Sequence, residues 1–264
     1  MAVITKQRVR LGSLALPSGW GLMLAAFELL AVYGLGRQSG WWWLAVVVVA
    51  AVELRSLRPG VGVSDKGWVA MGWERVPGFI MGISITLIMV LAPRLATQVV
   101  VAMLYAMWLG WRALQPAEHL TRYVNLLLVQ AVMFEAIFLM AAIWQTPGWL
   151  ILGLIWLGSY SSVYATLRQR ADRSAGVMAA TWGVIATEVA WVLSLWLITY
   201  TMRGGYVLVP QPALILTALG YVFGSILASS REGNLSRARL AEYLVIALVL
   251  VAIVVAGTSW RGNS

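Results

Sequence analysis

The sequence predicts an all-α fold: a polytopic α-helical membrane bundle of about nine transmembrane helices, with the N-terminus cytoplasmic and the C-terminus outside. Three observations predict it. Of 264 residues, 61% are hydrophobic and 11% are charged, with a mean hydropathy of +0.83, whereas soluble domains are about one-quarter charged. Apolar runs of membrane-spanning length recur along the chain, and basic residues alternate between the connections. We expect a single transmembrane domain over residues 1–264.

Each predicted span is a run of roughly 17–25 mainly apolar residues, the length that crosses a bilayer core. In order, the spans are 19–35, 42–57, 76–92, 95–114, 123–144, 149–167, 177–201, 209–229 and 241–257. The second is the weakest, because Glu53 and Arg55 stand at its end. The connection from Arg58 to Arg75 is the longest, and it is a candidate both for a short amphipathic helix in the interface and for docking a cytoplasmic partner.

The distribution of basic residues predicts the orientation. Of the 19 Lys and Arg residues, only Arg37, Arg94, Arg203 and Arg261 fall in the segments predicted to lie outside. The other 15 fall in the N-terminal tail and in every second connection, at or beyond the span ends. Because cytoplasmic loops carry the excess of Lys and Arg, these segments are expected in the cytoplasm. We expect an integral protein of the bacterial cytoplasmic (inner) membrane.

Composition also excludes several kinds of site. Cysteine is absent, and His119 is the single histidine, so thiolate and bis-histidine metal sites are excluded. No cofactor or metal is expected. The formal charge of +9 follows from the loop arginines, so nucleic acid is not an expected partner. The expected partners are the lipid bilayer and either other membrane proteins or further copies of the chain.

Three carboxyl groups fall near the middle of predicted spans: Glu28, Glu135 and Glu188. A charged side chain at the centre of a spanning helix costs about 2.5–3.5 kcal/mol on insertion scales. Such residues usually face the bundle interior or a wet cavity. Small residues on the faces of Glu28 and Glu135 favour an inward orientation, because they let a neighbouring helix approach closely. The three glutamates are therefore candidates for a proton relay or a cation site, while the alternative role is hydrogen bonding that fixes helix packing.

Polar side chains near these glutamates are candidates for lining a cavity. They are Gln130, Ser159, Tyr160, Ser162 and Thr187. The alternative for hydroxyl groups at these positions is a hydrogen bond back to a carbonyl oxygen of their own helix.

The sequence leaves three classes of function open. The leading interpretation is a small transporter or ion-translocating component that uses the mid-membrane glutamates. A second is a non-catalytic subunit or scaffold of a larger membrane complex. A third is a lipid-modifying enzyme, for which only the span ends near Glu53–Arg55 and Glu118–Arg122 offer acid–base groups. No residue is assigned as catalytic, and the balance is against an enzyme.

Overall fold

The computed structural model describes residues 68–92, 94–114, 119–168, 174–201, 208–231 and 235–256, together with Val47 and Gly233. Apart from Val47, the first two predicted spans lie outside the described residues, and Glu28 lies there with them. In chain order the described elements are α3 (Trp68–Leu91), α4 (Leu95–Leu114), α5 (His119–Trp144), α6 (Gly148–Arg168), α7 (Ala175–Ser194), β1 (Thr199–Thr201), β2 (Leu208–Pro210), α8 (Gln211–Arg231) and α9 (Arg237–Ala256).

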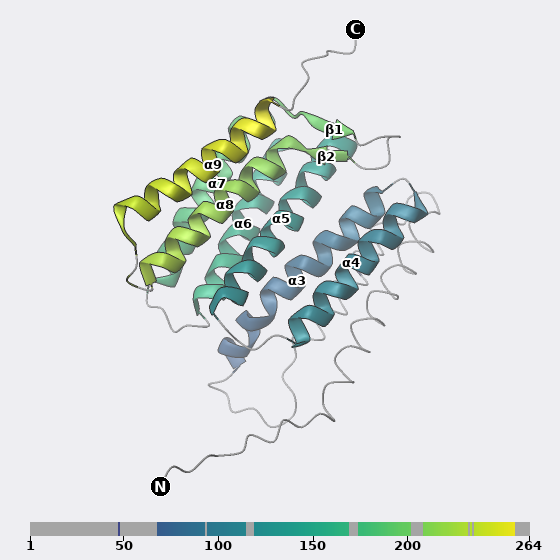
Figure 1. The fold of residues 1–264 in the computed structure, drawn as a ribbon. Helices are drawn as coiled ribbons and strands as arrows, with labels where there is room; N and C mark the ends of the chain where they lie inside the picture. The colour runs from purple at the N-terminus through teal and green to yellow at the C-terminus, as the bar shows by residue number, and fades with distance from the viewer. Residues whose placement is uncertain are drawn as a thin grey trace.

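Helix α5 is the centre of the described bundle. It contacts α3, α6, α8 and strand β2, and its side chains Phe134, Ala136 and Phe138 are fully buried. Helix α7 packs on α6 and α8, α4 packs on α3, and α9 packs on α8. Figure 1 shows the α3–α4 pair at one edge of the bundle and α9 at the opposite edge. Polar groups on α5 therefore lie where several helices meet.

A side chain in α4 closes the α3–α4 hairpin. The Gln98 Nε2 donates hydrogen bonds to the carbonyl oxygens of Met89 at 3.0 Å and Ala92 at 3.3 Å. The last carbonyl groups of a helix lack intrahelical partners, and in an apolar environment such groups are costly to leave unpaired. Farther along α4, Tyr105 and Trp108 stack with ring centroids 5.8 Å apart and pack in a common core cluster with residues of α3.

Helix α3 begins earlier than the apolar run alone indicates. The predicted span starts at Val76, because Glu74 and Arg75 interrupt the apolar residues there. The backbone is nevertheless helical from Trp68, and Pro77 lies inside the helix. Hydropathy limits the part of a helix that enters lipid, whereas backbone hydrogen bonding sets where the helix begins. Residues 68–75 of the predicted connection are thus helical and continuous with α3, while their place at the membrane interface stays a prediction.

A β-hairpin joins α7 to α8. Strand β1 pairs antiparallel with β2, with Tyr200 opposite Val209. The backbone N–H of Gln211 then donates to the Ile198 carbonyl oxygen at 2.8 Å. Threonine and tyrosine favour strands, and pairing satisfies backbone groups next to the hydrocarbon. The seventh predicted span therefore differs from the structure at its end: the helix stops at Ser194 rather than continuing to Thr201.

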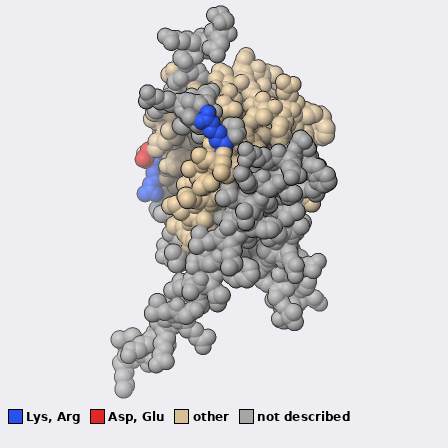
Figure 2. Space-filling view, turned by 90° about the vertical axis from the view of Figure 1, so that its right-hand side faces the viewer, with Lys and Arg blue, Asp and Glu red and all other residues tan. Residues whose placement is uncertain are grey.

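Four described helices are long and apolar enough to cross a membrane. They contain the segments Tyr123–Trp144, Gly148–Arg168, Ala175–Ser194 and Gln211–Ser230. Two further apolar segments, Val76–Leu91 and Leu95–Trp111, are shorter. In the face that Figure 2 presents, the described surface is almost uncharged. This part of the chain has the fold of an α-helical membrane protein, while the count of nine spans and the orientation stay predictions.

Candidate functional site

The carboxyl group of Glu135 lines a cavity between three helices. Glu135 lies 12 residues after Tyr123, which places it about 18 Å along the apolar segment that ends at Trp144. The cavity has a volume of about 270 Å³. Its other lining residues come from α3, α5 and α8: Ile88, Ala131, Val132, Ala213, Leu214 and Thr217.

Thr217 is the other polar side chain at this cavity. Its hydroxyl donates to the Ala213 carbonyl oxygen at 2.7 Å, within its own helix. The hydroxyl oxygen keeps lone pairs that can accept a further hydrogen bond. The Glu135 cavity therefore combines one carboxyl group and one hydroxyl with otherwise apolar walls.

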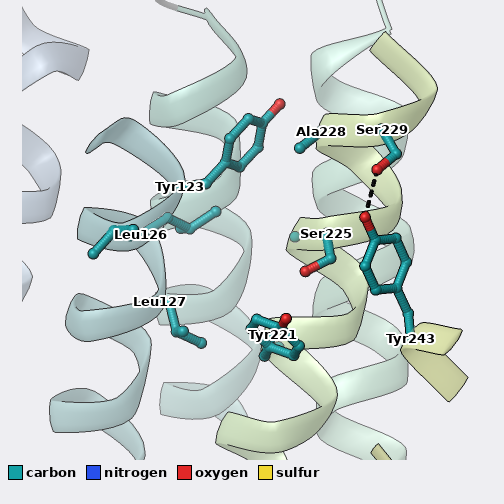
Figure 3. Close-up of a pocket in the computed structure, with 11 residues that line it drawn as sticks. Tyr123, Leu126, Leu127, Tyr221, Ser225, Ala228, Ser229 and Tyr243 are labelled. Atoms are coloured by element: carbon teal, nitrogen blue, oxygen red, sulfur yellow. Dashed lines mark hydrogen bonds between the residues drawn. The ribbon is translucent and has the colours of Figure 1, made fainter. Parts of the chain in front are cut away.

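A second cavity of about 330 Å³ lies toward the beginning of α5, between α5 and α8 (Figure 3). The hydroxyl groups of Tyr123, Tyr221, Ser225, Ser229 and Tyr243 belong to its lining. Ser229 and Tyr243 form a hydrogen bond of 2.8 Å that joins α8 to α9. In Figure 3 the Ser225 hydroxyl points into the space between α5 and α8. This cavity is much richer in polar groups than the Glu135 cavity.

The two cavities follow one another along the same contact between α5 and α8, which we call the α5–α8 seam. On α5, residues within Tyr123–Leu127 line the second cavity, and residues within Ala131–Glu135, farther along the helix, line the Glu135 cavity. On α8 the order is reversed: residues within Gly220–Ser229 line the second cavity, and residues within Ala213–Thr217, earlier in the helix, line the Glu135 cavity. The two helices are therefore antiparallel, and the cavities occupy successive stretches of their contact.

A hydroxyl stripe on α8 connects the two stretches. Thr217, Tyr221, Ser225 and Ser229 are spaced four residues apart, so they share one face of the helix. Thr217 lines the Glu135 cavity and the other three line the second cavity. Twelve residues of helix correspond to about 18 Å. The seam thus carries a row of hydroxyl groups from one end of the bundle to the depth of Glu135.

Gln130 is almost fully buried and lies on α5 between the stretches that line the two cavities, without lining either of them. Its Nε2 donates to Ser162 Oγ at 3.2 Å, and the Ser162 hydroxyl donates to the Ser159 carbonyl oxygen at 3.1 Å. A Cβ placed on Gly220 would lie 3.0 Å from Gln130 Oε1. Gln130 is therefore held by α6 on one side and packs tightly against the α8 backbone on the other.

Two buried polar atoms near this point make no hydrogen bond with any described residue: Ser159 Oγ and Trp182 Nε1. The Trp182 ring stacks on Phe223, with centroids 4.7 Å apart, and its ring also approaches Gly220. Most buried polar groups in proteins are paired, so these two atoms are exceptions within the described part of the chain.

The structure brings together only some of the residues that the sequence singles out. Gln130, Ser159 and Ser162 form one cluster beside the seam. Tyr160 is half-buried and stacks between Trp156 and Tyr164 on α6. The Thr187 hydroxyl donates to the Gly183 carbonyl oxygen of its own helix at 2.7 Å.

The side chains of Glu188 and Glu135 face different parts of the molecule. It is exposed on α7 and does not line either seam cavity, whereas Glu135 faces α3 and α8. The side chains of Glu118–Arg122, which the enzyme interpretation requires, lie outside the described residues, as does Glu53–Arg55. Within the described ranges no three metal-ligating side chains come together.

Sequence reasoning missed the hydroxyl stripe of α8 and the contribution of Tyr243. The stripe has a local signal, since four hydroxyl side chains recur at helical spacing from Thr217 to Ser229. The part played by Tyr243 has no such signal, because it depends on which helix α9 packs against.

The fold and the seam define a class of protein: an α-helical integral membrane protein with a carboxyl group set in a cavity at mid-span. No family model, curated protein or solved structure matches the chain.

Proposed function

We propose that the protein is a small transporter that moves protons or a small cation along the α5–α8 seam, with Glu135 as the group that takes up and releases the ion. The observation that carries this proposal is the hydroxyl stripe of α8, which leads to the cavity that Glu135 lines. A carboxyl group inside a membrane is expensive and is usually functional. Hydroxyl groups both donate and accept hydrogen bonds, so they can stabilise water or an ion beside an apolar wall.

The direction of access follows from the predicted orientation. The second cavity lies at the beginning of α5 and the end of α8, which the positive-inside rule places on the cytoplasmic side. We propose that ions exchange with the cytoplasm through this cavity, and that the protein resides in a bacterial cytoplasmic (inner) membrane. In this scheme Gln130 and Gly220 form the narrow point between the cytoplasmic cavity and Glu135.

The test is ion flux in liposomes that contain the purified full-length protein and a pH-sensitive dye. A potassium gradient with valinomycin supplies the driving force. Wild-type protein is expected to acidify or alkalinise the lumen according to the sign of the potential. Glu135→Gln removes the exchangeable proton while keeping the size of the side chain, so flux is expected to fall to the level of empty liposomes. Repeating the assay with a sodium- or potassium-sensitive dye separates proton from cation movement.

Two variants make this test specific. Glu188→Gln is the matched control, since it changes a carboxyl group that faces away from the seam, and it is expected to keep the wild-type rate. Gly224→Leu adds a side chain to the cytoplasmic cavity at a position where a new Cβ meets no atom within 4 Å. It is expected to slow flux without unfolding the protein. Full flux in Glu135→Gln, or loss of flux only in Glu188→Gln, would show that the seam is not the path.

A non-catalytic subunit of a larger membrane complex is the second candidate. The observation that favours it is the exposure of Glu188 on α7, because an exposed carboxyl group at this depth requires a partner other than lipid. This alternative predicts no flux from the purified chain and recovery of a different protein in fixed proportion after extraction in mild detergent.

A further inference from the structure

Helix α7 has two faces of different character. The inner face consists of small residues and one tryptophan, is buried, and packs on α6 and α8: Ala175, Ala179, Trp182, Gly183, Ala186 and Ala190. The outer face is broadly exposed and includes Ile185 and Val192. Along its length lies a line of exposed residues at alternating spacings of four and three: Val177, Thr181, Val184, Glu188, Trp191 and Leu195. We call this second set the α7 stripe.

The spacing of the α7 stripe is compatible with a helix–helix seam. Apolar residues that alternate at spacings of three and four keep one line facing a partner helix, as positions a and d do in coiled coils. Leu195 follows the last residue of α7 with helical dihedral angles (φ −68°, ψ −23°), so the stripe runs the full length of the helix. No described helix packs on it.

Glu188 is the residue in the stripe whose carboxyl group cannot form hydrogen bonds with lipid chains. It lies 13 residues after Ala175, about 20 Å along α7. None of the hydrogen bonds or ion pairs within the described part of the chain involves its carboxyl group. A carboxyl group exposed to hydrocarbon is costly, so the surface that covers the stripe must supply a hydrogen-bonding group at the same depth.

A second copy of the chain supplies that group by symmetry. Two copies of one membrane protein have the same orientation, so a two-fold axis between them runs along the membrane normal. Their α7 helices then pack in parallel, and each residue on the stripe meets its own equivalent. A carboxylic acid can donate through its hydroxyl and accept through its carbonyl, so two of them that share one or two protons are self-complementary. A single polar residue at an a position fixes register and copy number in this way in coiled coils.

We propose that the α7 stripe is the interface of a parallel homodimer in which the Glu188 side chains of two copies hydrogen-bond to each other across the axis. No Lys or Arg falls in the middle of a predicted span, so the chain itself offers no membrane-embedded cation for Glu188. The proposal does not depend on transport, since Glu188 faces away from the α5–α8 seam.

The natural absence of cysteine makes cross-linking a clean test. Single-cysteine variants Val184→Cys, Trp191→Cys and Leu195→Cys of the full chain are oxidised in the membranes of the expressing cells. Their products are then separated on a non-reducing gel. Each is expected to give a disulfide-linked band of twice the mass of the chain. The matched controls are Met107→Cys on α4 and Leu248→Cys on α9, whose native side chains are 69% and 71% exposed, and they are expected to stay monomeric.

Other outcomes of this cross-linking overturn the proposal. Equal cross-linking at the control positions would mean random collision. Absence of the dimer band at all three stripe positions would mean that a second copy of the chain does not pack on the stripe. A cross-linked product of a different mass would assign the stripe to a different protein.

Substitution of Glu188 tests the carboxyl pair itself. Glu188→Gln keeps a donor and an acceptor, so the dimer fraction measured by energy transfer between labelled copies in diluted liposomes is expected to remain. Glu188→Leu removes both, and is expected to weaken dimerisation about threefold, the average for interhelical hydrogen bonds in membranes, and at most about eighteenfold. An unchanged or stronger dimer in Glu188→Leu would overturn the role of the carboxyl pair.

Discussion

Gly220 and Gly224 form a GxxxG pair on α8, yet the two glycines have different surroundings. A Cβ on Gly220 would meet Gln130 Oε1 at 3.0 Å and the Trp182 ring at 3.6 Å. A Cβ on Gly224 would meet no atom within 4 Å, because this residue lines the second cavity. Only Gly220 therefore allows two helices to approach closely.

This difference predicts opposite outcomes for the same substitution. Gly220→Leu forces Gln130 or Trp182 to move and is expected to destabilise the protein by about 1–3 kcal/mol, as overpacked interiors usually are. Gly224→Leu places its side chain in the cavity and is expected to leave stability nearly unchanged. Thermal unfolding of the two variants in the same detergent measures the difference. Equal melting temperatures would contradict the close contact at Gly220.

The residues of the candidate site could be predicted from the sequence only in part. Glu135 was recognisable because a carboxyl group interrupts a long apolar run, and Gln130 and Ser162 because they are polar within spans. The outward orientation of Glu188 was not recognisable, since both faces of α7 are apolar. Its inner face is lined mainly with small residues and its outer face with large ones, and hydropathy alone does not say which face packs.

At the scale of elements, the apolar runs predicted most of each described helix and misplaced several ends. Helix α3 is longer than its apolar run, and α7 is shorter because residues 199–201 pair as a strand. Which helices are neighbours was beyond the sequence, because contacts between distant segments leave no local pattern. The packing of α9 on α8, and with it the Ser229–Tyr243 hydrogen bond, is one such contact.

The Ser229–Tyr243 hydrogen bond is expected to stabilise the packing of α9 on α8. Ser229 is buried and its hydroxyl lies 2.8 Å from the Tyr243 hydroxyl. Ser229→Ala and Tyr243→Phe are each expected to destabilise the protein, with a coupling between them of about 0.6 kcal/mol and at most about 1.7 kcal/mol. A double-mutant cycle on unfolding free energies measures this coupling. Independent effects that simply add would show that the hydroxyl pair does not join the helices.

At the scale of the whole molecule, α3, α6 and α8 pack on α5, and polar groups recur along the contact between α5 and α8. The α5–α8 seam combines a polar cavity at one end of the bundle with the Glu135 cavity farther along the two helices. The outer surfaces of α7 and α9 are instead rich in exposed apolar side chains. The central claim is that water reaches the depth of Glu135 along the seam.

Cysteine accessibility measures this most directly. Ala131→Cys and Thr217→Cys place thiols in the Glu135 cavity. Leu157→Cys places one on the exposed face of α6 at a similar depth, since neighbouring Gly158 packs against Met133 of α5. A charged, membrane-impermeant thiol reagent is expected to label the two seam cysteines and to leave Leu157→Cys unlabelled. If the seam cysteines are as unreactive as Leu157→Cys, water does not reach Glu135 and the proposed path is wrong.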